Sequence, residues 1–324
     1  MLSPVMISIL LQVGVVILLS VGFTFTYMVE KFPNFAHTAI CSIGTLVAFT
    51  LVRIYGLNPY QTWPIATLVG GLSGVGLYFL VVRPIKATGT REITLTFAFF
   101  AIAQIIGSLI SIYSYWFLFN QGYPTAGFSV QGFDFTWSDY PGVFLVALPT
   151  CVVLVAVLYF FLTRVRYGIA LRAVAEDEAL ASSLGVNIFF IHILSWFLTG
   201  ALAGLAGAII PLWRNTGLGF NDTLLILVMA GSVIGGLNSV TGAVVGGLLV
   251  AILPKFLSAV LMFIFNRVFI EYEALFPIIF IFVVLMIEPD GIMGILNRPH
   301  SPRRTLNDAI HRLKSLYNRV FHGV

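Results

Sequence analysis

Few residues in this 324-residue chain have the types and spacing that catalysis requires. None of the five histidines stands at the spacing of a metal-binding pair. The sequence also lacks a Gly-Lys pair, which the phosphate-binding loop of an ATPase needs. We therefore expect no catalytic residue, no metal site and no cofactor, and we expect that the chain does not hydrolyse ATP by itself.

Charge is instead concentrated in residues 164–187, which join two long apolar stretches. Residues 171–184 are helix formers without Pro or Gly, Gly185 suits a helix C-terminus, and Asn187 suits the start of the next element. We expect a short cytoplasmic helix that fits a groove of another protein and passes its movement to the membrane helices. An ordinary solvated loop is the alternative interpretation. We expect Glu176, Asp177 and Glu178 to make the charged part of this contact, and Arg166 and Arg172 are further coupling candidates on the same segment.

Polar residues at the ends of apolar stretches are the candidates for a solute pathway. Asn34 and His37 stand where the first apolar stretch gives way to the second. A break later in the chain, at Gly235, Gly236 and Asn238, is a place where exposed backbone could line a cavity. Helix capping and turn formation explain the same residues without a pathway, and for Asn34 an N-cap is an equally good interpretation.

These residues must be positioned by membrane-spanning helices. The chain is 59% hydrophobic and only 9% charged, and its mean hydropathy is +1.01. Its apolar runs are long and lack the alternation of an outer-membrane barrel strand. We predict an all-α polytopic membrane protein with eight or nine crossings, of which residues 222–235 form a short, broken or re-entrant helix. The predicted spans are 5–29, 37–53, 63–82, 93–113, 141–163, 188–210, 222–235, 239–262 and 274–288.

Glycines four residues apart predict close contacts between these helices, because they remove side chains from the contact. The pairs are Gly200/Gly204, Gly231/Gly235 and Gly242/Gly246.

Lys and Arg residues fix the expected orientation, since basic loops stay cytoplasmic. The basic segments are the loop holding Arg83, Lys86 and Arg91, the 164–187 segment, and the tail 296–324. With nine spans, this places the N-terminus outside and the C-terminus in the cytoplasm of a plasma (inner) membrane protein, with the 114–140 loop outside. We expect a transmembrane domain over 1–295 and a basic tail over 296–324 that forms an amphipathic helix on the membrane surface. Docking of this tail onto a cytoplasmic partner is the alternative interpretation. This scattered positive charge is topogenic and indicates no nucleic-acid partner.

The 164–187 segment resembles the coupling loop of the branched-chain amino acid permease family, whose members serve ATP-binding-cassette importers. That family has an aromatic or small residue and Gly, then Leu-Arg-Ala, an acidic pair, and an ending of the type Leu-Gly-Val. The matching residues are Tyr167-Gly168, Leu171-Arg172-Ala173, Glu176-Asp177 and Leu184-Gly185-Val186.

Other motifs of the same family follow in the same order, and the resemblance covers about residues 15–295. Asn34-Phe35-Ala36-His37 and Arg83-Pro84 resemble its first two motifs. The later motifs of the family are matched by residues 202–208, 235–243 and 289–294. The chain departs from the family at Thr38 and Ala39, which stand where the family has Gly and an acid, and at Asn238, which replaces a Gly.

The resemblance implies a permease subunit of an importer for branched-chain or related amino acids. Its implied partners are two cytoplasmic ATPase subunits that bind ATP, a second and related permease subunit, an extracytoplasmic substrate-binding protein and membrane lipid. It also adds Gly168, Ala173, Leu184 and Gly185 to the coupling candidates and Phe35 to the pathway candidates.

The rival hypothesis is an ion-coupled secondary transporter of a small solute. Such a protein should carry charged groups at mid-membrane depth, which this chain nearly lacks. Lys255 is the clearest exception, and we expect its ammonium to reach the interface instead of coupling transport to an ion. A membrane enzyme is a third hypothesis, weakened by the missing catalytic clusters.

Overall fold

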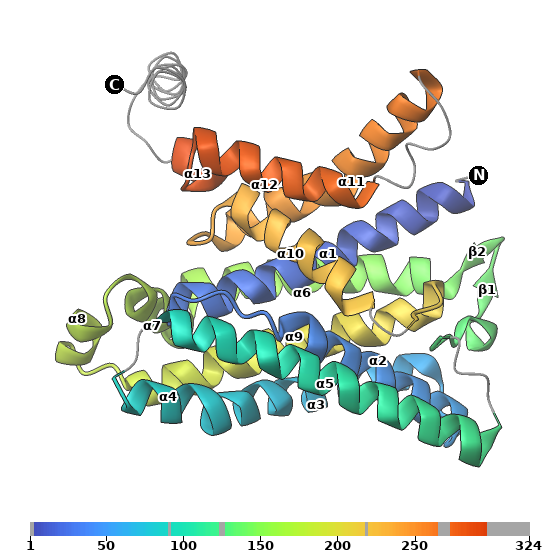
Figure 1. The fold of residues 1–324 in the computed structure, drawn as a ribbon, viewed down its shortest axis with the longest axis horizontal. Helices are drawn as coiled ribbons and strands as arrows, with labels where there is room; N and C mark the ends of the chain where they lie inside the picture. Colours follow the sequence, from blue (N-terminus) through green and yellow to red (C-terminus); the bar gives the residue numbers. More distant parts are fainter. Residues whose placement is uncertain (1–2, 90–91, 123–126, 218–219, 265–272, 297–324) are drawn as a thin grey trace.

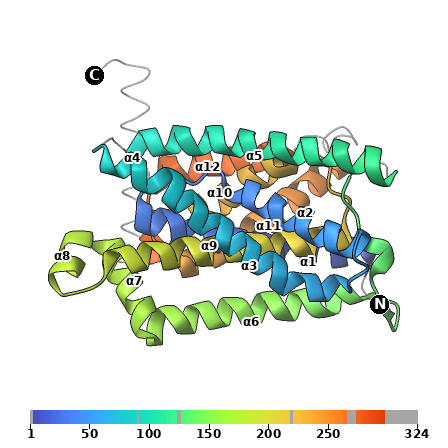
Figure 2. The same ribbon diagram turned by 90° about the horizontal axis from the view of Figure 1, so that it is seen from below.

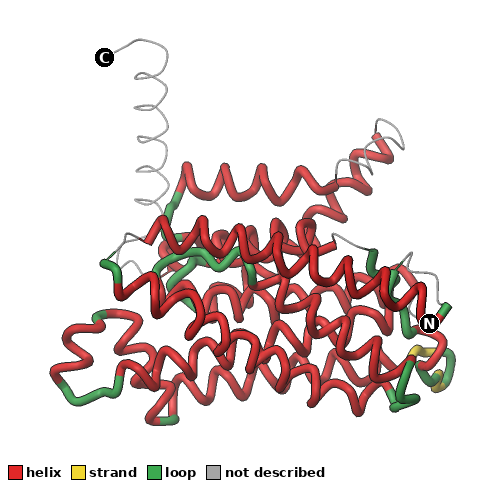
Figure 3. The backbone as a smooth tube through the Cα atoms, turned by 60° about the horizontal axis from the view of Figure 1, so that its bottom comes forward, coloured by secondary structure: helices red, strands yellow, loops and turns green. Residues whose placement is uncertain are grey.

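The computed structural model describes residues 3–89, 92–122, 127–217, 220–264 and 273–296. Helices make up nearly all of this described part (Figure 3), and a two-residue antiparallel hairpin is the only sheet within it. The α-helices are α1 (Pro4–Glu30), α2 (His37–Arg53), α3 (Pro59–Leu77), α4 (Arg83–Ala87), α5 (Glu92–Gln121), α6 (Gly142–Arg164), α7 (Arg166–Glu176), α8 (Glu178–Ser183), α9 (Ile188–Trp213), α10 (Phe220–Gly235), α11 (Val240–Ile264), α12 (Leu275–Ile287) and α13 (Gly291–Leu296).

The predicted all-α membrane architecture is confirmed. Among the described residues, seven helical stretches are long and apolar enough to cross a membrane, and two shorter apolar helices, α2 and α10, lie among them. The seven long stretches are Pro4–Glu30, Pro59–Ala87, Glu92–Gln121, Gly142–Arg164, Ile188–Trp213, Val240–Ile264 and Leu275–Gly294. The predicted number of eight or nine crossings agrees with these helices approximately.

Two of the predicted spans are longer or more complex than predicted. The third span runs from Pro59 through a π-helical turn at Tyr78–Val82 into α4, so Pro84 sits in a first helical turn, where proline is tolerated. The fourth span continues to Gln121, well beyond its predicted end. Its last two turns hold Tyr115, Trp116 and Phe119, aromatic residues suited to a membrane interface.

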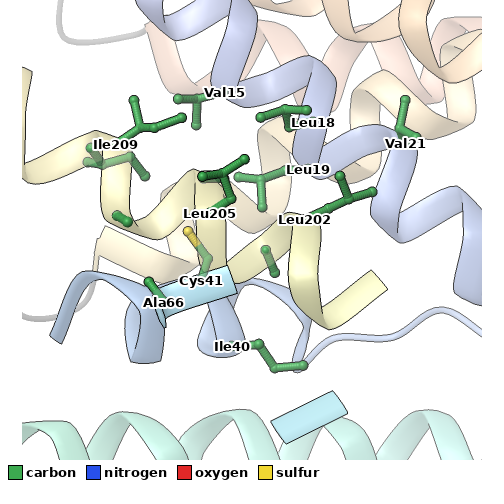
Figure 4. Packing of buried hydrophobic residues seen from close by; sticks show 14 of the residues in the cluster. Val15, Leu18, Leu19, Val21, Ile40, Cys41, Ala66, Leu202, Leu205 and Ile209 are labelled. Carbon is green, nitrogen blue, oxygen red and sulfur yellow. The ribbon is translucent and has the colours of Figure 1, made fainter. Parts of the chain in front are cut away.

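Helix α9 forms the centre of the bundle, and in the view of Figure 2 it lies with α3 between α5 and α6. Its apolar residues are buried against α1 and α2, and in Figure 4 Leu202 and Leu205 lie beside Leu18 and Leu19 of α1. Ser20, Thr24 and Thr26 of α1 are also fully or almost fully buried. Helix α1 is therefore enclosed by protein over much of its length.

Glycine contacts bring these helices together as predicted. A Cβ atom at Gly70 of α3 would lie 2.7 Å from the Cα of Gly204, and one at Gly204 would lie 3.0 Å from the Cα of Gly70. In the second contact, a Cβ at Gly231 of α10 would lie 3.0 Å from the Cα of Gly247 of α11. Since even one methyl group would meet backbone at these positions, glycine is required for the observed packing.

The connection between α1 and α2 is the part of the fold that most affects the candidate pathway. Residues 31–36 are non-helical and return between the helices before α2 begins (Figure 1). His37, the first residue of α2, has its Nε2 atom 3.0 Å from the carbonyl oxygen of Leu19. Leu19 lies eleven residues before Glu30, or about 16 Å along α1, so α2 begins near the middle of the bundle.

The two ends of the bundle have different character. The N-terminal turn of α1 and the hairpin β1 (Thr136–Trp137) and β2 (Tyr140–Pro141) lie at one end, and α7 and α8 lie at the other (Figure 1). Trp213 Nε1 donates to Ser8 Oγ at 3.1 Å, which joins the end of α9 to the start of α1. The predicted basic tail, 296–324, lies outside the described residues except for Leu296.

Candidate functional site

The predicted coupling helix is two helices, α7 and α8, set beyond one end of the bundle (Figure 1). The break falls at Asp177, whose backbone is extended (φ −151°) and whose Oδ1 accepts the backbone N–H of Leu180 at 2.9 Å. Helix propensity alone predicted one helix over 171–184, but an aspartate can instead cap a new helix. The expectation of a single helix is therefore wrong at this residue.

The predicted end of this segment is confirmed. Helix α8 stops at Ser183, and Gly185 follows with a φ of +84°, a conformation that glycine adopts without strain. Asn187 Oδ1 then accepts the backbone N–H of Phe190 at 3.1 Å and so caps α9. The segment thus leaves and re-enters the bundle through defined helix termini.

The coupling candidates divide into anchoring and exposed residues. Gly168 is buried against α6, where a Cβ atom would lie 2.8 Å from the Cα of Leu162, and Ala173 is partly buried. The outward surface combines charge with apolar side chains, since Leu180 and Leu184 are 58% and 76% exposed. The other exposed candidates are Arg166, Arg172, Glu176, Asp177, Glu178 and Gly185.

A buried ionic cluster lies directly beneath this segment, and the sequence analysis missed it. Glu30, the last residue of α1, has a fully buried side chain whose Oε2 lies 2.6 Å from Lys86 Nζ. Its Oε1 accepts hydrogen bonds from His192 Nδ1 at 2.7 Å and from Trp196 Nε1 at 2.8 Å. The cluster therefore ties α1 to α4 and α9 at one point.

The same cluster reaches the exposed segment through the histidine ring. His192 Nε2 lies 3.5 Å from Glu178 Oε1 on α8, and the ring of Tyr78 stacks on that imidazole at a centroid distance of 5.7 Å. A carboxylate ending an otherwise uncharged span was the sequence signal for Glu30. The partners could not be identified from that signal because His192 is 162 residues away.

The structure places Asn34, Phe35 and His37 together at the start of α2. Asn34 Oδ1 accepts the backbone N–H of Ala36 at 3.1 Å, so Asn34 shapes the turn before the helix and is not the N-cap. His37 and Asn34 are both fully buried, and the His37 ring also lies edge-on to Phe23 at 6.3 Å. The predicted pathway residues of this motif are thus near the middle of the bundle.

The other predicted pathway residues lie elsewhere. Gly235 packs against Gly242, and Gly236, with a φ of +108°, lies beside the backbone of Asp290. Asn238 Oδ1 accepts a hydrogen bond from Lys31 Nζ at 3.4 Å. Lys31 is the residue that follows Glu30 in the sequence. The structure therefore groups Gly235, Gly236 and Asn238 with the α7–α8 end of the bundle.

A cavity of about 420 Å³ joins these residues to the coupling segment, with Lys31 and Asn238 on one side and Arg172 and Glu176 on the other. Lys31 is in the left-handed backbone region (φ 60°). Burial lowers the pKa of its ammonium, and the negative charge of Glu92 partly offsets that effect.

Elsewhere, Lys255 Nζ lies 3.5 Å from Glu273 Oε1, so this lysine has a carboxylate partner. No cluster of three or more metal-ligating side chains occurs among the described residues.

Comparison with known proteins places this sequence in a family. The sequence model of the family described as "branched-chain amino acid transport system / permease component" matches residues 5–285. A probable branched-chain amino acid transport permease protein LivH of Methanocaldococcus jannaschii is 32% identical over 282 residues, which cover 87% of this chain and 89% of the relative.

More distant relatives agree. The high-affinity branched-chain amino acid transport system permease protein BraD of Pseudomonas aeruginosa is 28% identical over 86% of this chain and 91% of its own length. Among solved structures, PsaBC from Streptococcus pneumoniae in complex with Fab covers 91% of this chain and 96% of its own, with a TM-score of 0.50 and 15% identity, which bears on the fold alone. The extent of the family match and the identity to the archaeal relative show that this chain belongs to the branched-chain amino acid transport permease family.

Proposed function

We propose that this chain is the membrane-spanning subunit of an ATP-binding-cassette importer that moves branched-chain or related amino acids inward. This substrate class is the one named in the description of the family and in the names of the relatives. ATP binding and hydrolysis then belong to two separate cytoplasmic subunits, and this chain has a mechanical role in place of a catalytic one. An extracytoplasmic binding protein delivers the solute.

The observation that carries the proposal is the contact between α8 and the buried cluster. Glu178 stands on an exposed helix and also reaches His192, whose other ring nitrogen bonds to Glu30 at the end of α1. Movement of α7 and α8 by a docked partner is therefore transmitted to α1 and α9 through directional polar contacts. Exposed leucines beside the acidic residues suit a groove that is partly apolar.

The proposed orientation places the α7–α8 end in the cytoplasm and the N-terminus outside. It is supported by the positions of the basic residues, because Lys86, Arg172 and Lys31 all lie at the α7–α8 end. The opposite end carries residues 114–122 and 127–140, which include Asp134 and Asp139 but no Lys or Arg.

A second permease subunit is supported by the exposed face of α5. In the most apolar 18-residue stretch of α5, only 17% of the residues are buried within this chain. In the corresponding stretch of α9, 78% of the residues are buried. A related permease and the surrounding lipid would cover this face between them. We propose a heterodimer, as in the family this chain resembles.

The test is to purify the complex gently from its native membrane, identify the co-purifying proteins and measure leucine uptake in proteoliposomes. We expect Glu178→Lys to separate ATP hydrolysis from uptake while the subunit stays in the membrane. Glu92→Lys is the matched control, because it reverses another exposed carboxylate at the same end.

Normal uptake by the Glu178→Lys variant would remove α8 from the coupling contact. If the purified chain carries no ATPase partner even after cross-linking, and moves a solute along an ion gradient alone, the secondary-transporter hypothesis replaces this one.

A further inference from the structure

A polar cavity of about 260 Å³ opens between the first turns of α2, the middle of α5 and the start of α10. These helices are distant in the sequence, and none of the cavity's polar side chains belongs to the ionic cluster described above. The volume is close to the lower end, roughly 300 Å³, of sites that take small molecules. The cavity is thus suited to a solute about the size of an amino acid.

The wall supplied by α5 is unusual for a membrane-spanning helix. Gln104, Ser108 and Ser111 follow one another at intervals of four and three residues, so they share one face of the helix and line the cavity. The two serine hydroxyls donate to carbonyl oxygens of their own helix, at 2.8 and 3.0 Å, and keep lone pairs for a solute. No residue of the described chain hydrogen-bonds to the side-chain amide of Gln104. Such a stripe is costly against lipid and suits a solute.

The cavity also has positive and negative sides. Thr38 and Ala39 line it from the first turn of α2, and their backbone N–H groups have no hydrogen-bond partner in the described chain. These N–H groups lie at the positive end of the helix dipole and favour an anionic group. Asp222, the only charged residue of the lining, contributes a carboxylate that has no ion pair with a described residue.

Apart from Ser42, the side chains on the rest of the wall are apolar. Phe35 and Phe100 meet edge to face at 6.1 Å, and Leu225 of α10 lies on the same lining. A ligand that satisfies this cavity carries an anionic group, a cationic group and a hydrocarbon side chain. An α-amino acid zwitterion with an apolar side chain has all three.

We propose that this cavity is a transient binding site for the transported amino acid within the permease. The solute carboxylate meets the N–H groups of Thr38 and Ala39, and the ammonium meets Asp222 and the side-chain oxygen of Gln104. The hydrocarbon side chain lies against Phe35 and Phe100. The inference rests on the proposed function and adds to it the place and chemistry of the solute contact.

The first test labels single cysteines in the complete, reconstituted transporter with a water-soluble methanethiosulfonate reagent. Cys41 and Cys151, both buried, are first replaced by alanine. Ser108→Cys reports on the cavity, and Leu109→Cys is the matched control, because Leu109 is 59% exposed but does not line the cavity. We expect Ser108→Cys to react about tenfold faster than Leu109→Cys, in line with water entering only the polar side.

Protection by leucine then identifies the ligand chemistry. We expect leucine to slow labelling of Ser108→Cys, while 4-methylvalerate, which lacks the ammonium, and isopentylamine, which lacks the carboxylate, do not. Equal labelling of the two cysteines, or equal protection by all three compounds, overturns the proposal.

The second test measures the leucine concentration that gives half-maximal uptake. We expect Asp222→Asn to raise this concentration about tenfold, because the loss of one charge-assisted hydrogen bond weakens binding by about that factor. Asp222→Glu, which keeps the carboxylate, should bring the concentration part of the way back to the wild-type value. Asp139→Asn, at the exposed hairpin, should leave it unchanged. If the wild-type complex carries no leucine at all, the proposed function fails; if it carries leucine while Asp222→Asn matches the wild type, only the binding site fails.

Discussion

Glu30 Oε1 lies 2.7 Å from His192 Nδ1 inside the bundle, and this contact joins the last residue of α1 to the second turn of α9. The next residue, Lys31, begins the non-helical segment that leads to His37 and the start of α2. A displacement of α8 at Glu178 therefore has a short route, through His192 and Glu30, to the segment that positions the start of α2.

Removal of the buried charge should destabilise the bundle. We expect Glu30→Gln to lower the free energy of unfolding by about 3 kcal/mol, because Lys86 and His192 lose the ionised partner that the buried Glu30 carboxylate provides. A denaturant titration that unfolds the purified chain in detergent measures this change in the free energy of unfolding.

The chain offers a control in Lys255 and Glu273, a partly exposed pair whose atoms are 3.5 Å apart. Glu273→Gln should change the same free energy by less than about 1 kcal/mol. Equal effects of the two substitutions would mean that the Glu30 cluster has no special role in stability.

The position of His37 depends on a missing side chain opposite it. A Cβ atom at Gly22 would lie 2.8 Å from His37 Cε1, so Gly22→Ala should push the imidazole away from the Leu19 carbonyl. Overpacking of this kind costs about 1–3 kcal/mol, and we expect uptake to fall about tenfold with the subunit still in the membrane. Gly76→Ala, where a Cβ meets nothing within 4 Å, should leave uptake unchanged. A normal rate in the Gly22→Ala variant would show that the packing here tolerates displacement.

Asp177 can act through its charge or through its cap, and two substitutions separate these roles. Asp177→Asn keeps an oxygen that accepts the Leu180 N–H, so it should retain most of the uptake if the cap matters. Asp177→Ala should cost about 1 kcal/mol of helix stability and lower the uptake obtained per ATP hydrolysed. Equal losses in both variants would assign the effect to the negative charge.

The exposed leucine at the tip of α8 should contribute to partner docking. We expect Leu184→Asn to reduce the amount of ATPase subunit that co-purifies, while the thermal stability of this chain stays the same, because Leu184 is 76% exposed. Tyr55→Asn is the control, since Tyr55 is 69% exposed but lies at the opposite end. Loss of the partner in both variants would point to a general solubility effect.

Much of the architecture could be predicted from hydropathy because a lipid-exposed helix must be long and apolar. The predicted span 37–53 coincides with α2, and the predicted glycine contacts occur. Depth could not be predicted: hydropathy says that α2 is apolar but not that it begins beside Leu19. That placement depends on the path of residues 31–36, where Phe32 packs in one cluster with Phe99 of α5 and Trp196 of α9.

The candidate site was predictable only in part for a related reason. Local sequence signals identified Gly185 and Asn187 as helix boundaries, and both serve as such. The Glu30 cluster is formed by residues from three helices, and no local pattern relates them. At Asp177, two local preferences compete, and capping of α8 prevails over continuation of the helix.

The start of α2 halfway along α1 has a consequence for how the protein is made. With 17 residues, α2 is about 25 Å long and cannot bridge a hydrocarbon layer of roughly 30 Å on its own. Its buried face rests on α9, which ends at Trp213 and which the ribosome completes about 160 residues after the end of α2 at Arg53. Stable membrane insertion of α2 must therefore wait for synthesis of α9, so the first third of the chain reaches its final arrangement only after the second third has entered the bilayer.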